Sequence, residues 1–93
     1  MSTIQEIAVA DVLHERLRQD DKWKEQNHDP YTYLAILIEE VGEIGKAILE
    51  HYFEGAEPTK IREEVVHACA VALAMIECLD RDNWMWGNMG RTR

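Results

Sequence analysis

The stretch Val65-Val-His-Ala-Cys-Ala-Val-Ala-Leu-Ala-Met-Ile76 decides the fold that we predict for this chain. Apart from His67 it is apolar almost all round, which predicts the middle of a helix, about Lys60 to Leu79, that is buried on most sides. The stretch is shorter than the roughly 20 apolar residues that a membrane helix needs. We therefore expect a buried helix of a globular domain and no membrane segment.

Two further helices are predicted upstream of this one. Apolar residues recur at helical spacing from about Ile4 to Lys24, and Thr3 and Glu6 stand in the positions of a capping box. A second apolar face runs from about Tyr31 to Phe53, after a polar break that ends in Pro30. No segment alternates with period two, so we expect an all-α helical bundle of three helices plus a C-terminal tail or short helix.

The size of the chain favours self-association. It has 93 residues, and we expect residues 1–93 to form a single domain. A domain this small buries a modest share of its surface, so we predict a four-helix-type bundle completed by a second copy, in a homodimer or homotetramer. Gly42 and Gly45 within the second helix predict that another backbone approaches closely there. Trp84 and Trp86 in the tail are interpreted as packing or interface residues.

Composition excludes several classes of function. The formal net charge is −8, so nucleic acid is not an expected partner, and a phosphorylated substrate would need a metal cation between the two sets of negative charge. The first residues lack the pattern of a secretory signal. Cys69 and Cys78 lie on one predicted helix, roughly 13 Å apart along its axis, which is too far for a disulfide. We therefore expect a cytoplasmic protein.

Acidic residues interrupt the apolar helices. Glu40 and Glu43, three positions apart, project from one side of the second helix, and Glu64 and His67 repeat this spacing on the third. Carboxylates crowded in a poorly hydrated place stay ionised only beside cations. Oxygen ligands of this kind suit Mg²⁺ or Mn²⁺, so the two half-sites predict a divalent-metal centre.

The order of these motifs is similar to that of a known family. Glu39-Glu40-Val-Gly-Glu43, followed by Glu63-Glu64-Val-Val-His67, resembles the MazG-like branch of the all-α nucleoside triphosphate pyrophosphohydrolase superfamily. That family carries Glu-Glu-x-x-Glu on one helix and Glu-x-x-Asp on the next. The stretch from Glu15 to His28 also resembles the first helix of small MazG-like proteins of phages and bacteria. The resemblance covers the chain from about Val12 to Asp82.

The resemblance implies a Mg²⁺-dependent hydrolase that converts (d)NTP and water into (d)NMP and pyrophosphate, a reaction that cleans the nucleotide pool. Glu40, Glu43 and Glu64 would be metal ligands, and Glu39 would orient or deprotonate the attacking water. Metal ions in such a site neutralise the triphosphate and lower the pKa of bound water. Family members are dimers or tetramers, which agrees with the expectation from chain length.

One position departs from the family pattern, because His67 stands where the family has Asp. Imidazole suits Mn²⁺, Co²⁺, Fe or Zn²⁺ better than Mg²⁺. Either the metal preference has moved, or His67 binds no metal and catalysis is weakened or lost.

A nucleotide substrate also needs a surface for its base. Trp23, with Asn27 and His28 just beyond it, is the candidate, since stacking a base on an aromatic ring contributes ~1–3 kcal/mol. The alternative is that Trp23 packs the first helix against the tail. Lys46, one turn past Glu43, is the best candidate for a phosphate contact.

Two other functions remain open from the sequence. Glu64-x-x-His67 also occurs in ferritin-like carboxylate bundles, in which it binds a di-iron centre together with glutamates from neighbouring helices. The chain could also be an inactive family member that binds a nucleotide or a partner protein.

Overall fold

The protein is built from three helices. The structure, a computed structural model, describes residues 1–81, which form α1 (Ile4–Trp23), α2 (Pro30–Glu54) and α3 (Thr59–Arg81). This confirms the predicted all-α fold, with each helix within a few residues of its expected bounds. Trp84 and Trp86 lie outside the described residues. As expected for the apolar stretch of α3, none of the three helices is long and apolar enough to cross a membrane.

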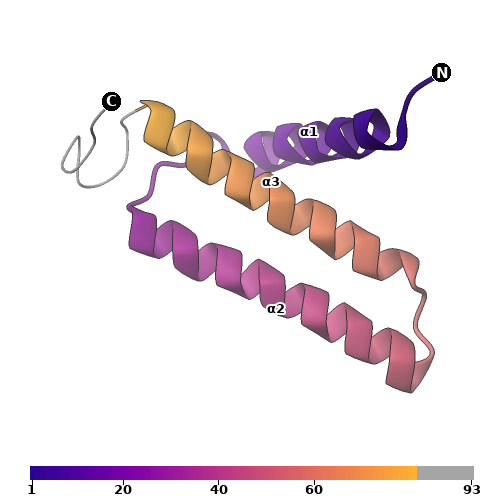
Figure 1. The fold of residues 1–93 in the computed structure, drawn as a ribbon. Helices are drawn as coiled ribbons and strands as arrows, with labels where there is room; N and C mark the ends of the chain where they lie inside the picture. The colour runs from indigo at the N-terminus through magenta and orange to yellow at the C-terminus, as the bar shows by residue number, and fades with distance from the viewer. Residues whose placement is uncertain (82–93) are drawn as a thin grey trace.

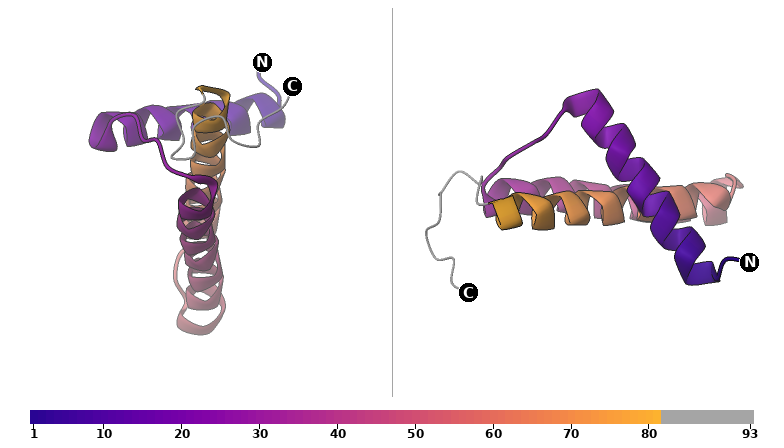
Figure 2. Two further views of the ribbon diagram at one scale, coloured as in Figure 1. Left: turned by 90° about the vertical axis from the view of Figure 1, so that its left-hand side faces the viewer. Right: turned by 90° about the horizontal axis from the view of Figure 1, so that it is seen from above.

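The helices form a hairpin with a third helix lying across it. α2 and α3 run antiparallel and side by side along their length (Figure 1). α1 crosses α3 at a steep angle on the side away from α2, as the two further views show (Figure 2). α3 is therefore the central element, and α1 and α2 make no direct helix-to-helix contact within the described residues.

Side chains at the helix ends explain where the helices begin and stop. The predicted capping box of α1 is present, with the Glu6 amide donating to Thr3 Oγ1 at 3.1 Å and the Thr3 amide donating to Glu6 Oε1 at 2.9 Å. Asp29 caps α2 by accepting from the amide of Thr32 at 2.9 Å. Gly55 follows the last residue of α2, and its φ of +73° is the left-handed conformation that glycine adopts without strain.

The core of the single chain is small. Tyr33 of α2 and Cys78 of α3 are buried together, and the Tyr33 hydroxyl donates to the backbone carbonyl of Gln26 at 2.9 Å. The apolar stretch of α3 was expected to be buried on most sides, and this is only partly so. Ala68, Ala70 and Val71 are buried, but Val65 and Ile76 are exposed. The reason is that α1 and α2 cover two sides of α3 and leave a third side open.

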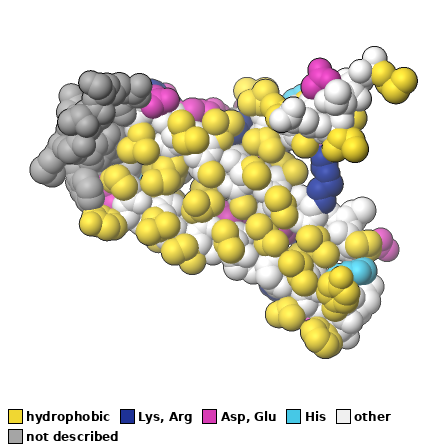
Figure 3. Space-filling model, viewed as in Figure 1, with side chains coloured by type: hydrophobic (Ala, Val, Ile, Leu, Met, Phe, Trp, Pro, Cys, Tyr) yellow, Lys and Arg dark blue, Asp and Glu magenta, His cyan; other side chains and the backbone are white. Residues whose placement is uncertain are grey.

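Two rows of small or apolar residues, most of them exposed, follow the hairpin. On α2 the spacing alternates between four and three, through Leu34, Ile38, Val41, Gly45, Ile48 and Tyr52. On α3 the same spacing links Val65, Cys69, Ala72 and Ile76. In each helix the row lies roughly a quarter turn from the residues packed between α2 and α3, and the antiparallel arrangement puts both rows on one side. We call this side the apolar face; Figure 3 shows hydrophobic side chains gathered over the hairpin.

The close backbone approach predicted at Gly42 and Gly45 does not occur within the described part of the chain. A Cβ atom placed at either glycine meets nothing within 4 Å. If the two glycines have a packing role, the backbone that approaches them is not that of residues 1–81 of the same chain.

Candidate metal centre

Three of the predicted metal ligands converge between α2 and α3. Glu40, Glu64 and His67 each offer a ligand atom, and these atoms lie within 4.8 Å of one another. The helix pairing explains the convergence, because Glu64 and His67 lie one turn apart on α3 and Glu40 faces them from α2. Glu64 is 6% exposed, and the other two are half-buried. We call these three residues the metal group.

The other two acidic residues of the motif border the metal group. Glu39 and Glu43 are exposed on α2, on either side of Glu40 in the sequence. Among residues 1–81, neither carboxylate is part of the group whose ligand atoms could hold one ion together. Both carboxylates are close enough to act on Glu40 electrostatically.

The metal group crowds negative charge. Burial is the main reason that the pKa of Glu40 lies above the usual range of a glutamate. The nearby His67 opposes this shift. Repulsion from three neighbouring carboxylates adds to it, those of Glu64, Glu43 and Glu39. A bound cation would offset both the cost of burying the Glu40 charge and the repulsion between the carboxylates. The donor set therefore fits a divalent ion.

Replacing Glu40 with glutamine is expected to stabilise the chain at pH 7 in the absence of divalent metal. Because the pKa of Glu40 is raised on folding, the folded chain holds this proton more tightly than the unfolded chain. That stabilisation is fully present below the ordinary glutamate pKa of about 4.3 and is lost as the pH rises through the raised value. Glutamine keeps the uncharged state at pH 7. Thermal melts in a chelator should therefore give Glu40→Gln the higher midpoint at pH 7, and equal midpoints below pH 4.

Glu57→Gln, in the exposed loop between α2 and α3, is the control for removal of one negative charge and should not raise the midpoint at either pH value. Equal midpoints for wild type and Glu40→Gln at pH 7 would contradict the crowding of charge at this site.

Cations from two directions compensate the acidic residues. Lys60 Nζ lies 3.0 Å from Glu64 Oε1. On α1, Arg18 binds both carboxylate oxygens of Glu15 at 2.7 Å, and Glu15 in turn approaches His67, with 3.8 Å between Oε1 and Nε2. The hydrogen bonds from Arg18 hold the pKa of Glu15 below its usual range.

Sequence reasoning did not assign Glu15, Arg18 or Lys60 to the site. The signal for Lys60 was present, since it lies four residues before Glu64 on one helix face. The signal for α1 was weak, because the helix turns polar side chains inward. Glu15, Arg16 and Gln19 are buried, and Leu13 and Leu17 are exposed.

A cavity of about 360 Å³ opens beside the metal group, within the size range of small-molecule sites. Glu40 and His67 line it, and it reaches Trp23 near the end of α1. Tyr33 and Val71 contribute to its apolar wall. One predicted substrate-binding residue, Trp23, thus shares a cavity with two members of the metal group.

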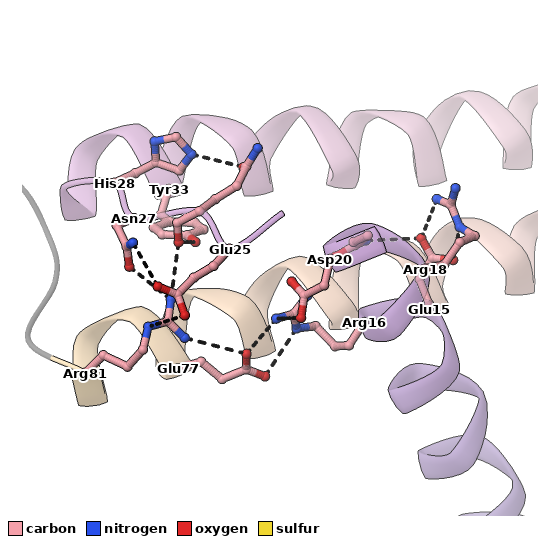
Figure 4. A network of polar contacts seen from close by, with 12 residues as sticks. Glu15, Arg16, Arg18, Asp20, Glu25, Asn27, His28, Tyr33, Glu77 and Arg81 are labelled. Carbon is pink, nitrogen blue, oxygen red and sulfur yellow. Dashed lines mark hydrogen bonds and ion pairs between the residues drawn. The ribbon is translucent and has the colours of Figure 1, made fainter. Parts of the chain in front are cut away.

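The other predicted substrate-binding residues lie elsewhere. Asn27 Oδ1 accepts from Arg81 at 3.0 Å, and the ring of His28 stands edge-on to Tyr33 with centroids 5.0 Å apart (Figure 4). Lys46 is exposed on α2. None of these three side chains lines the cavity described by residues 1–81.

Ion pairs hold the rim of the cavity. Arg16 donates to both carboxylate oxygens of Glu77, at 2.6 and 3.2 Å, and pairs with Asp20 of its own helix at 3.1 Å. Arg81 joins the end of α3 to the loop after α1, where it donates to the carbonyl of Gln26 at 3.3 Å (Figure 4). The wall of the cavity is therefore polar and charged on the α1 side, which suits a polar ligand.

Comparison with known proteins identifies no relative: no protein-family model, no curated protein and no solved structure matches the chain. What the site can do therefore has to follow from its own residues.

Proposed function

We propose that this protein is a metal-dependent nucleoside triphosphate pyrophosphohydrolase that converts (d)NTP and water into (d)NMP and pyrophosphate. One observation carries the proposal. Glu40 and His67, which meet Glu64 between α2 and α3, line a cavity that Trp23 also lines. Ligands for a divalent ion and a flat aromatic surface for a base are thus available to one small molecule.

Each residue has a proposed role. Glu40, Glu64 and His67 would hold the ion, and Glu43 would join them from its exposed place on α2. The ion would neutralise the triphosphate and polarise the α-phosphoryl group. Glu39, also exposed, would orient or deprotonate the attacking water. The donor set combines carboxylates with an imidazole, which favours Mn²⁺, Co²⁺, Fe or Zn²⁺ alongside Mg²⁺.

Trp23 would stack on the nucleobase, and its place in the cavity supports this role. For the phosphates, Arg18 lines the same cavity from α1, whereas Lys46, the cation favoured from the sequence, does not. Nucleotide bound here would therefore contact α1 with both its base and its phosphates.

We propose further that the protein is a homo-oligomer, built on a dimer whose two hairpins pack through their apolar faces. The two rows have the four-and-three spacing by which helices pair along a seam. Ile38 and Tyr52 are 61% and 74% exposed in the single chain, so a large apolar surface needs covering. A second copy offers the same two rows and would complete a four-helix bundle.

The test of the proposed activity is a panel of (d)NTPs with Mg²⁺, Mn²⁺ or Co²⁺, assayed for pyrophosphate and for the monophosphate product. We expect release of pyrophosphate in stoichiometric amounts with (d)NMP for at least one nucleotide. Absence of hydrolysis with every metal would remove the enzymatic proposal. Nucleotide binding without turnover would favour the inactive alternative. A ferric chromophore after aerobic addition of Fe²⁺ would favour the ferritin-like alternative.

A further inference from the structure

The imidazole of His67 stands between two carboxylates on different helices. Its Nδ1 lies 3.4 Å from Glu64 Oε2, one turn back on α3, and its Nε2 lies 3.8 Å from Glu15 Oε1 on α1. The two ring nitrogens therefore have different neighbours, and the first lies beside a member of the metal group. The second faces α1.

Glu15 is fixed independently of His67. Arg18 donates to both of its oxygens at 2.7 Å, and Gln19 Nε2 donates to Oε2 at 3.1 Å. Glu15 is only 8% exposed, although it carries a charged carboxylate. A buried charge held by two partners on its own helix has little freedom to move, so the position of Oε1 beside the ring is set by α1.

We propose that Glu15 is a positioning residue for His67: its carboxylate accepts a hydrogen bond from Nε2–H, which stays on the ring, and thereby directs Nδ1 toward the ion. This inference rests on the proposed metal centre. Metal-binding histidines generally donate their second N–H to a carboxylate, carbonyl or water, which fixes the ring and makes the ligating nitrogen more basic. The separation of 3.8 Å exceeds a hydrogen bond, so the proposal requires the ring to move closer to Glu15 when the ion is bound.

The proposal explains how the chain can accommodate histidine where the resembling family has aspartate. An aspartate at position 67 would set its carboxylate against that of Glu15, and the two would repel. A histidine turns the same contact into an attraction. Glu15 and His67 would therefore act as a pair, and each should matter only in the presence of the other.

The experiment measures Zn²⁺ and Co²⁺ affinity of the full chain by isothermal titration calorimetry. Glu15→Gln is expected to weaken binding by about 10- to 100-fold, the usual effect of removing such a partner. Glu15→Asp keeps the charge but withdraws it by one methylene, and it should show most of the same loss. Glu63→Gln is the matched control: it removes an exposed charge beside Glu64 and should change affinity little.

The decisive comparison uses His67→Asp as background. There, Glu15→Gln should leave affinity unchanged or raise it, because a repulsion is removed. An equal weakening in both backgrounds would mean that Glu15 acts only as a general negative charge, and it would overturn the proposal.

Nitrogen-15 spectra of the Zn²⁺-loaded chain give a second readout. Coordination through Nδ1 with a protonated Nε2 supports the proposal, and coordination through Nε2 overturns it. Melting curves confirm that each variant is folded.

These outcomes separate the inference from the proposed activity. Coupled metal binding without pyrophosphate release would keep the role of Glu15 and remove the enzymatic function. Pyrophosphate release with no coupling between Glu15 and His67 would do the reverse. A wild-type chain that binds neither Zn²⁺ nor Co²⁺ would overturn the role of Glu15, whereas the proposed activity would still be decided by the assays with Mg²⁺ and Mn²⁺.

Discussion

If the proposed activity is present, Glu40→Gln is expected to lower the rate of pyrophosphate release by at least ~100-fold. Removing a residue that only hydrogen-bonds a metal ligand already costs up to about 100-fold, and Glu40 would be a ligand itself. Among residues 1–81, Glu40 is the only residue of α2 that belongs to the metal group. Glutamine keeps the shape of the side chain but removes the charge that holds a divalent ion. Rates with the best nucleotide and metal from the panel provide the measurement.

The same variant carries its own control for folding, because it should be more stable than wild type in the absence of metal. Loss of activity in a chain with a raised melting temperature cannot be attributed to unfolding. Glu57→Gln should retain full activity. An unchanged rate for Glu40→Gln would remove Glu40 from the metal centre, and the proposed function with it.

Val41→Asp is expected to convert the proposed homo-oligomer into monomers. Val41 lies in the middle of the α2 row and is 54% exposed in the single chain. In the proposed dimer its side chain would be buried against the second copy, where an unpaired carboxylate is strongly unfavourable. Light scattering should give a mass of at least twice 10.8 kDa for wild type and a single-chain mass for the variant.

Val41→Leu is the conservative control and should remain oligomeric, since it keeps an apolar side chain in the seam. Circular dichroism shows whether the helices survive in Val41→Asp. A wild-type chain that is monomeric at high concentration would contradict the proposed dimer. An oligomeric Val41→Asp would place the interface elsewhere.

The sequence was sufficient to predict the helices and part of the site. Apolar periodicity located all three helices, and the Thr3–Glu6 pair located one helix start to the residue. The spacing of Glu64 and His67 placed both on one turn of α3, because helical geometry alone determines that relation. The meeting of these two with Glu40 needed the further condition that α2 and α3 pair, which the many apolar residues of both helices favoured.

The part that could not be predicted concerns α1. Periodicity marks Leu13 and Leu17 as belonging to an apolar side, and such a side is usually turned inward. In the structure α1 faces α3 with Glu15 and Arg16, and the leucines are exposed. Pairing between charged side chains far apart in sequence, such as Arg16 with Glu77, leaves no periodic signal in either helix.

The way in which α1 is attached has a consequence for its behaviour in solution. Two ion pairs link it to α3, with Asp11 2.8 Å from Arg62 near the start of α3 and Arg16 2.6 Å from Glu77 near its end. The hairpin instead depends on apolar burial around Tyr33 and Cys78. Dissolved ions screen exposed charge pairs but not apolar contacts. The Arg62–Asp11 pair is exposed, whereas Arg16 is buried, so salt should weaken the first pair much more than the second. Concentrated salt should therefore loosen the N-terminal half of α1 first and leave the hairpin in place.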